Sequence, residues 1–414
     1  MTIEMKSITD RFLQYVAMDT QSDEQSNSQP STIGQLDLQL VLLQELSAMD
    51  VIVNLDPNGY LTAYIPANIE GDIPAIGFIA HVDTSPDCPG NNINPQIVEN
   101  YNGDDIVLNK ERGIVLSPQA FPELKNYIGQ TLITTDGTTL LGADDKAGVA
   151  AIMQAIKYIV EHHDMPHGNI YFAFTPDEEV GRGTKHFDTQ RFAAQYAYTI
   201  DGGEVGEIEF ENFNAATATL VIHGTNIHPG YAKGKMISAI NLAMEIDGML
   251  PKSERPETTE GYEGFYHLTN LVGSVEKATM QYIIRDHDKT KFQQRKDTLT
   301  DIAQTINDKY GNNTVEISIT DTYYNMKEVV QQHYHIVEKA MQAMEYCGIT
   351  PKVRAIRGGT DGATLSFKGI PCPNIFAGGH NFPGRYEYLP VQSMAKATEV
   401  ILQIITLFAN DKNK

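Results

Sequence analysis

Several apolar segments with the composition of buried strands end at an acidic or imidazole side chain, and this feature limits the folds open to the chain. In an open α/β sheet, the carboxyl ends of parallel strands meet at one edge, and ligands bind there. Strands that are neighbours in such a sheet would therefore bring these distant residues together. The residues concerned are His81 and Asp83 after Ile76–Ala80, Asp144 after Leu140–Leu141, Glu178 and Glu179 after Asn169–Thr175, Asp201 after Tyr196–Ile200, and His380 after Asn374–Phe376.

The order of predicted strands and helices in the middle of the chain differs from that at its two ends. Residues 213–324 follow the order strand, helix, strand, strand, helix, strand, which is typical of one sheet with helices on a single face. We therefore predict an α/β domain made of residues 1–212 and 325–414, interrupted by an inserted α+β domain of residues 213–324. The predicted elements of the insertion are strands at Ala215–His223, Gly264–Val275, Thr279–Asp286 and Thr314–Thr320, and helices at Met236–Leu250 and Lys291–Tyr310.

Two further expectations concern the first third of the chain. A helix is predicted over Ile33–Met49, because Leu36, Leu40, Leu43 and Leu46 recur at a helical spacing and would share one apolar stripe. Residues 85–131 are rich in Pro, Asn and Gly, and we expect them to form a long surface excursion with little regular structure.

Composition narrows the choice of partner and compartment. The 414 residues include 31 Lys and Arg against 53 Asp and Glu, a net charge of −22, which argues against a nucleic acid or an anionic membrane as partner. Cys88, Cys347 and Cys372 have no CxxC spacing, so we expect neither a disulfide framework nor a thiolate zinc site. Charged residues interrupt the first twenty positions, and no apolar run is long enough to span a membrane. We expect a cytoplasmic protein.

The polar strand ends have the composition of a divalent metal site. Two imidazoles and three carboxylates without a thiolate suit zinc, manganese or cobalt. Three anionic ligands offset the charge of two dications, and one carboxylate can bridge them. Asp83 lies two residues after His81 on a strand, so it points the same way and can hold the second ring nitrogen of that histidine. Glu178 would then remain as a general base.

Each of these residues also has an interpretation without a metal. Asp144 is suited to capping the helix that begins beside it, Glu178 and Glu179 to a solvated turn, and His81 to a hydrogen-bonded place in the core. Five such sites at strand ends are hard to explain by separate structural roles. Their coincidence favours the metal site.

Seven motifs occur in order over nearly the whole chain. They are Ala80-His81-Val82-Asp83-Thr84, LGADDKAG at Leu141–Gly148, TPDEEVG at Thr175–Gly181, Asp201-Gly202-Gly203, HPGYAKG at His228–Gly234, RGGTDGA at Arg357–Ala363, and Gly378-Gly379-His380-Asn381. Together they resemble the peptidase T branch of the M20 metallopeptidases, the tripeptide aminopeptidases. The resemblance implies a mixed-sheet catalytic domain like that of zinc exopeptidases, with the inserted βαββαβ domain as a lid.

The resemblance also implies a role for each motif residue. Two zinc ions, with cobalt or manganese as alternatives, would be bound per chain. Glu178 would be the general base of a metal-activated water attack, and Asp83 the partner of His81. The metal ligands would be His81, Asp144 and Asp201 for one ion and Asp144, Glu179 and His380 for the other, with Asp144 bridging.

Three residues are candidates for binding the peptide substrate. By the resemblance, His228 reaches the substrate carbonyl and helps hold the oxyanion; the alternative is a turn histidine before proline. Arg285 suits a peptide carboxylate, since its guanidinium can bind it with two hydrogen bonds; the alternative is an ion pair with Asp286 or Asp288. Arg357 lies in a Gly-rich loop that could approach a peptide, and would be a second carboxylate anchor.

Three functions are compatible with these residues. The first is an aminopeptidase that releases the N-terminal residue of tripeptides. The second is a dipeptidase or an N-acyl amino-acid amidohydrolase of the same superfamily. The third is a peptide- or metal-binding protein without turnover, which would not need Glu178. Pairing through edge strands of the insertion would allow a homodimer.

Overall fold

The computed structural model describes residues 3–410 and divides the chain into two compact units. Of the described residues, the first unit contains 3–210, 328–354 and 360–410, and the second contains 211–327 and 355–359. The second unit thus includes 355–359 in addition to a continuous stretch, a return of the chain that the sequence analysis did not predict.

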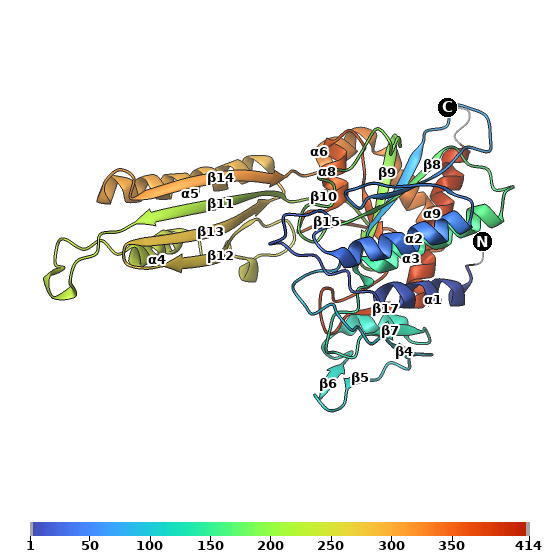
Figure 1. Cartoon of the computed structure of the whole chain (residues 1–414), viewed down its shortest axis with the longest axis horizontal. Coiled ribbons are helices and arrows are strands. Elements are labelled where there is room, and N and C mark those ends of the chain that lie inside the picture. The colour runs from blue at the N-terminus through green and yellow to red at the C-terminus, as the bar shows by residue number, and fades with distance from the viewer. Residues whose placement is uncertain (1–2, 411–414) are drawn as a thin grey trace. The chain divides into compact units, whose positions relative to one another are not determined.

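An eight-stranded mixed sheet forms the centre of the first unit (Figure 1). Its middle strands β8, β3, β9 and β16 are parallel, while β1, β2 and β10 pair antiparallel with their neighbours. All six residues of β3 are buried, as expected for a parallel strand covered on both faces. In spatial order the strands are β1 (Ile52–Leu55), β2 (Leu61–Ile65), β8 (Ile170–Thr175), β3 (Ile76–His81), β9 (Tyr196–Gly202), β16 (Asn374–Phe376), β10 (Glu207–Asn212) and β15 (Lys352–Ile356).

Helices pack against this sheet and against one another. The helix α3 contacts β3, β9, α1 and α9, and α9 also contacts α7 (Figure 1). Among residues 3–410, no helix is both long and apolar enough to cross a lipid bilayer. The helices of this unit are α1 (Met5–Val16), α2 (Ile33–Ala48), α3 (Ala143–Glu161), α7 (His335–Tyr346), α8 (Asp361–Phe367) and α9 (Val391–Ala409), with the short α6 (Lys327–Val330) at its boundary.

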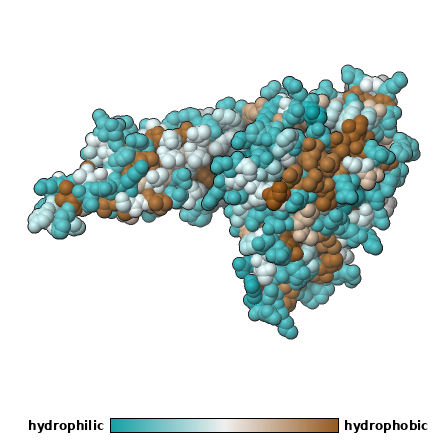
Figure 2. All heavy atoms as spheres, in the orientation of Figure 1, coloured by the Kyte–Doolittle hydropathy of each residue, from teal (hydrophilic) through white to brown (hydrophobic). Residues whose placement is uncertain are grey.

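The helix α2 forms as predicted, but only Leu46 of the predicted apolar stripe is fully buried, and Leu40 lies on the exposed side. Leu38, Leu42 and Leu46 are fully buried, whereas Leu40 is 48% exposed. Leucines are spread around several sides of the helix, and the buried face also includes Gln35 and Gln39, so leucine spacing alone could not select it. Figure 2 shows apolar atoms gathered over the region where Figure 1 places α2.

Residues 85–131 are more ordered than the sequence analysis predicted. They contain β4 (Gln96–Val98), β5 (Ile106–Asn109), β6 (Ile114–Leu116) and a 3₁₀ helix, η1 (Pro122–Tyr127). The strand β4 pairs with β7 (Leu132–Thr134), which in turn pairs with β17 (Tyr388–Pro390). Isolated apolar residues in this segment, among them Leu108, Leu116 and Leu124, build a small core of their own. The expectation of little regular structure was therefore wrong.

The second unit is built on a four-stranded antiparallel sheet. Its elements follow the predicted order, with β11 (Asn214–His223), α4 (Ala239–Met249), β12 (Phe265–Gly273), β13 (Lys277–Asp286), α5 (Lys289–Tyr310) and β14 (Val315–Tyr323). The spatial order is β12, β13, β11, β14 (Figure 1). Alternate residues of β11 and β13, such as Leu220 and Tyr282, share a core with Leu242 and Leu299 of the two helices. One face of the sheet is thereby covered.

Candidate active site

The parallel strands of the first unit carry the predicted site residues at their carboxyl ends. His81 is the last residue of β3, and β8, directly beside it, ends two residues before Asp177. Asp201 lies near the end of β9, and His380 follows β16 by four residues. Because β8, β3, β9 and β16 run in the same direction, these residues share one edge of the sheet.

Three of the predicted metal ligands form a compact group. One side-chain ligand atom each from His81, Asp144 and Asp201 can be chosen so that all lie within 4.8 Å of one another. The His81 Nε2 atom is 3.0 Å from Asp144 Oδ1 and 3.5 Å from Asp201 Oδ1. The side chain of His81 is almost fully buried, whereas both carboxylates remain partly accessible. This arrangement presents one imidazole and two carboxylates to a common point.

Asp83 contacts both His81 and the neighbouring turn. Its Oδ1 atom is 3.3 Å from His81 Nδ1, and its carboxylate accepts the backbone N–H groups of Glu178 at 2.9 Å and of Glu179 at 3.1 Å. The side chain of Asp83 is fully buried. The ring nitrogen Nδ1 of His81 is also hydrogen-bonded to the backbone carbonyl of Asp83 at 3.0 Å, so Asp83 as a whole fixes the ring relative to the backbone of the Glu178–Glu179 turn.

The helix α3 is capped by Asp145, whereas capping was the alternative role considered for Asp144. The Asp145 carboxylate accepts the N–H of Gly148 at 3.2 Å and the N–H of His81 at 3.2 Å. Asp144 has φ −85° and ψ 108°, so its backbone is extended and not helical. Its side chain is therefore free of the capping role and lies beside His81.

Glu179 and His380, the other two predicted ligands, lie outside the group of His81, Asp144 and Asp201 in the described structure. The Nε2 atom of His380 is 2.6 Å from the Tyr127 hydroxyl, and its ring stacks on Tyr388 with centroids 4.7 Å apart. Burial lowers the pKa of His380 to about 4, which keeps the imidazole neutral. Their assignment as metal ligands stays a prediction.

The carboxylates at the sheet edge are crowded and poorly hydrated. Burial, followed by the charge of Asp144, raises the pKa of Glu179 to about 9. Burial also raises the pKa of Asp201 to about 6 and, together with the charge of Asp201, the pKa of Glu178 well above its usual value. Burial alone would lower the pKa of His81, but the neighbouring carboxylates outweigh it and raise that pKa. The carboxyl groups of the site therefore resist ionisation together unless a positive charge is placed among them.

The three candidate substrate-binding residues all belong to the second unit. His228 is exposed at the start of a short 3₁₀ turn, η2 (Pro229–Tyr231), and accepts the N–H of Gly230 through Nδ1. Arg285 donates to the carbonyl of Arg357 at 3.1 Å, while its buried Nε atom has no hydrogen-bond partner in the described structure. The predicted alternative partner Asp286 is instead paired with Arg295 at 2.8 Å.

The guanidinium of Arg357 is occupied within the second unit. It donates to the carbonyls of Gly261 at 2.7 Å and Glu263 at 3.1 Å, and lies over the ring of Phe213. These contacts hold the 355–359 segment in its own unit. A role of Arg357 in binding a carboxylate stays a prediction, as do the substrate contacts of His228 and Arg285.

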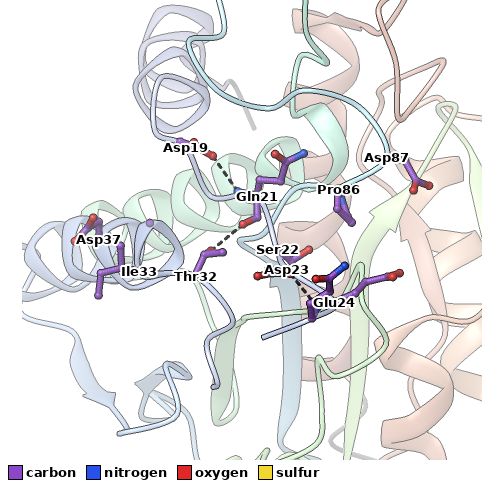
Figure 3. Close-up of a pocket in the computed structure, with 12 residues that line it drawn as sticks. Asp19, Gln21, Ser22, Asp23, Glu24, Thr32, Ile33, Asp37, Pro86 and Asp87 are labelled. Atoms are coloured by element: carbon purple, nitrogen blue, oxygen red, sulfur yellow. Dashed lines mark hydrogen bonds between the residues drawn. The ribbon is translucent and has the colours of Figure 1, made fainter. Parts of the chain in front are cut away.

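A separate hollow of about 780 Å³ in the first unit is strongly acidic (Figure 3). None of the predicted site residues lines it. Asp19 and Gln21 lie on its wall, where the N–H of Gln21 donates to the Asp19 carboxylate at 3.2 Å. The carboxylates that line it are Asp19, Asp23, Glu24, Asp37 and Asp87.

Sequence reasoning missed several buried residues that support the site. Asp177 precedes Glu178 and has a left-handed backbone with φ +60°. Its carboxylate accepts the backbone N–H of Ser31 and the side-chain amide of Gln35. Glu387 is buried and accepts N–H groups of the loop before α3. Asp177 lies inside a quoted motif, but Glu387 lies in no pattern that the analysis recognised.

An α/β sheet with acidic and imidazole groups at its carboxyl edge is a place where a ligand or metal can bind, and comparison with known families identifies the class of protein. The chain belongs to the peptidase family M20/M25/M40, whose family model matches residues 135–407. It is therefore a peptidase, a hydrolase of peptide bonds. This result confirms the predicted mixed-sheet α/β fold.

Curated relatives show which members of this family the chain is similar to. Peptidase T of Caldanaerobacter subterraneus subsp. tengcongensis is 58% identical over 405 residues, which cover 98% of this chain and 99% of the relative. Peptidase T of Alkaliphilus oremlandii is 55% identical over 410 residues, which cover 98% and 100%. These matches confirm the resemblance to the peptidase T branch.

Two solved structures share the fold. Aminopeptidase PepT from Bacillus cereus ATCC 10987 superposes with a TM-score of 0.77 at 25% identity, covering 99% of this chain and 100% of that one. A Bacillus subtilis protein described as a dinuclear metal binding peptidase from the M20 family gives a TM-score of 0.64 at 14% identity. That match covers 97% of this chain and 98% of the other, and it shows the fold alone.

Proposed function

We propose that this peptidase releases the N-terminal residue of tripeptides and uses two divalent metal ions, zinc first among them. The observation that carries the proposal is the group of His81, Asp144 and Asp201, with Asp83 placed behind His81. Two features support the substrate class: the solved structure from Bacillus cereus that shares the fold is described as an aminopeptidase, and the relatives named peptidase T match nearly the full chain.

The donor set fits a divalent cation of the zinc type. One neutral imidazole and two carboxylates are ligands that zinc, manganese and cobalt accept, and thiolates are not needed. Buried carboxylates that crowd together require a positive charge to offset their repulsion. His81 cannot supply that charge and also bind a metal, because a ligating histidine is neutral. Asp144 would be shared by both ions, with Glu179 and His380 completing the second set.

Different residues of the chain would have different roles in peptide-bond hydrolysis. A bound divalent ion lowers the pKa of a water molecule and polarises the scissile carbonyl. Glu178 takes the proton of the attacking water and passes it to the departing amine. Asp83 holds the backbone of Glu178 and the ring of His81 at once, so the base and the ligand keep a fixed spacing. General acid–base catalysis of this kind contributes about 10²–10⁴-fold to the rate.

The assignment of substrate has a direct test. Purified protein is assayed against di-, tri- and tetrapeptides, acetylated tripeptides and N-acyl amino acids, each with and without a chelator. We expect chelator-sensitive release of the first residue of free tripeptides, with little cleavage when the amino terminus is acetylated. A preference for dipeptides or N-acyl amino acids would favour the alternative of a dipeptidase or amidohydrolase. Binding of peptides without any turnover would contradict both.

Two properties stay predictions alongside this function. The sparse, free cysteines favour a reducing compartment such as the cytoplasm. A homodimer, and the use of the second unit as a lid, are expectations that sedimentation and domain-specific variants can test.

A further inference from the structure

The segment Leu141–Asp144 leads into the regular part of α3, because Asp144 and Asp145 still have non-helical backbones. This segment has few hydrogen-bond acceptors of its own. Gly142 has φ +83°, a left-handed conformation that glycine adopts without strain, and it offers no side chain to accept a hydrogen bond. The N–H groups of Leu141, Ala143 and Asp144 donate to a side chain more than two hundred residues away in the sequence. Buried N–H groups without an acceptor cost free energy, so something distant in sequence must accept them.

Glu387 provides the acceptor. Its Oε2 atom accepts the N–H of Leu141 at 2.7 Å, and its Oε1 atom accepts that of Ala143 at 2.6 Å, with the N–H of Asp144 at 3.4 Å. The side chain is buried, with 1% exposure. Both oxygens are thus used on the four-residue stretch Leu141–Asp144. A buried carboxylate that accepts several N–H groups holds a loop more firmly than neutral acceptors do.

The residue next to Glu387 is tied to His380. Tyr388 and His380 exchange backbone hydrogen bonds, at 2.9 Å from His380 N to Tyr388 O and at 3.2 Å in the reverse direction. The two rings stack with an interplanar angle of 9°. One short segment, Glu387–Tyr388, therefore contacts both the loop of Asp144 and the loop of His380, although those loops are more than two hundred residues apart.

We infer that Glu387 is a positioning residue that sets the distance between Asp144 and His380 and thereby the affinity for one of the two metal ions. The inference rests on the proposed function, in which these two residues share the second ion. The hydrogen bonds that Glu387 accepts within the described residues come from Leu141, Ala143 and Asp144 and not from His81 or Asp201, so the ion that those two would bind with Asp144 should depend on Glu387 less. The effect is thus expected to be unequal between the two ions.

The test is a titration of the metal-free protein with Co²⁺, followed by visible absorption in competition with a chelator. Glu387→Gln keeps the size of the side chain but places an amide N–H₂ against a backbone donor. We expect the affinity for the ion shared by Asp144 and His380 to fall by about 10–100-fold, the usual cost of losing a residue that orients a metal ligand. The affinity for the ion bound by His81 and Asp201 should stay near the wild-type value. Activity lost at low Co²⁺ should return with excess Co²⁺.

Two further variants keep the test decisive. Glu387→Asp retains a carboxylate and should recover part of the affinity for the ion shared by Asp144 and His380. It replaces Glu387→Gln in the test if that variant does not fold. Glu45→Gln is the matched control, because Glu45 also accepts two side-chain hydrogen bonds, from Arg11 at 2.9 Å and Tyr15 at 2.8 Å, but lies on α2. It should leave both affinities unchanged.

The outcomes separate the inference from the proposed function. If the wild-type protein binds two ions and folded Glu387→Gln binds both equally well, the inference is wrong and the proposed function stands. An equal loss of both affinities would also contradict it, because it would indicate a general loss of structure. If the wild-type protein binds no transition ion, the proposed function itself fails.

Discussion

The carboxylate of Asp83 accepts the backbone N–H of Glu178 at 2.9 Å while its Oδ1 atom lies 3.3 Å from the ring of His81. The residue proposed as base is thus held through its backbone by the same side chain that orients a proposed metal ligand. Its own carboxylate is left available for a proton. This relationship leads to the first prediction.

Glu178→Ala should keep the metal and lose most of the turnover. The backbone N–H that Asp83 accepts is still present, so His81 stays in place, while the rate should fall by about 10²–10⁴-fold with the loss of the base. Metal content by elemental analysis and kcat on a free tripeptide check this. Glu161→Ala, at the end of α3, is the control and should behave as wild type. A wild-type rate in Glu178→Ala with full metal content would remove Glu178 from the mechanism.

Removal of the metal should abolish activity and lower stability together. A ligand that binds only the folded state stabilises it by about 2.7 kcal/mol when present at a hundred times its dissociation constant. We therefore expect chelation to lower the Tm and to stop peptide cleavage. Zinc, cobalt or manganese should restore both, whereas calcium should not, because imidazole is a poor ligand for it. Full activity after exhaustive chelation would contradict the prediction.

Asp177→Asn should lower kcat more than it changes KM. Asp177 precedes Glu178 and is held by the Ser31 N–H at 2.9 Å and the Gln35 amide at 2.8 Å, so it fixes the start of the turn. Asparagine also tolerates a left-handed backbone, which leaves the conformation itself unstrained. Loss of the charged acceptor should cost about 1–3 kcal/mol in the free energy of unfolding.

The control for that variant is Asp56→Asn. Asp56 also accepts backbone N–H groups, those of Asn58 at 2.8 Å and Tyr60 at 3.0 Å, in a turn between β1 and β2. It should lower stability without changing kcat. Equal kinetic effects in the two variants would show that Asp177 acts only through global stability.

The stability of the protein should fall with rising pH, because the Glu209 carboxyl binds its proton more tightly in the folded state than in the unfolded state. Burial, followed by the charge of Glu207, raises the pKa of the Glu209 carboxyl to about 8 from an unfolded value near 4.5. The folded state therefore binds this proton more tightly than the unfolded state, and the stabilisation is lost as the pH rises between these two values. Glu209→Gln stays neutral and keeps an acceptor for Asn374, which donates to Glu209 at 2.7 Å.

The measurement is the free energy of unfolding of wild type and Glu209→Gln across the neutral range. The advantage of the variant should grow steadily from about pH 5 to about pH 8 and then level off. Glu161→Gln provides the comparison and should show no such growth. A constant difference between Glu209→Gln and wild type at all pH values would contradict the prediction.

Two leucines of α2 separate the buried face from the exposed one. Leu42 is fully buried and Leu40 is 48% exposed. Leu42→Ala should therefore cost about 2–5 kcal/mol, because it removes buried methyl groups and leaves a cavity. Leu40→Ala should change stability by less than about 0.5 kcal/mol. Denaturant unfolding measures both, and equal costs would place the buried face elsewhere.

Much of the fold follows from local sequence. The strands at Ile76–His81 and Ile170–Thr175 are recognisable because a parallel strand buried on both faces is almost wholly apolar. The order of elements in the second unit follows from the alternation of its strand and helix patterns, since each pattern reflects which face of its own element is buried. The stripe on α2 was predicted correctly only at Leu46, because leucines occur on several sides of that helix and glutamines share its buried face.

The candidate site also has features that the sequence predicts and features that only the tertiary structure shows. By itself, the sequence determined which chemical groups stand at the strand ends, because a residue type and its place after an apolar run are local properties. Only the tertiary structure decided that Asp145 and not Asp144 caps α3, and that Glu387 holds the loop of Asp144. A backbone N–H group can donate to any buried carboxylate that packing brings within reach, so no spacing along the chain records that partnership.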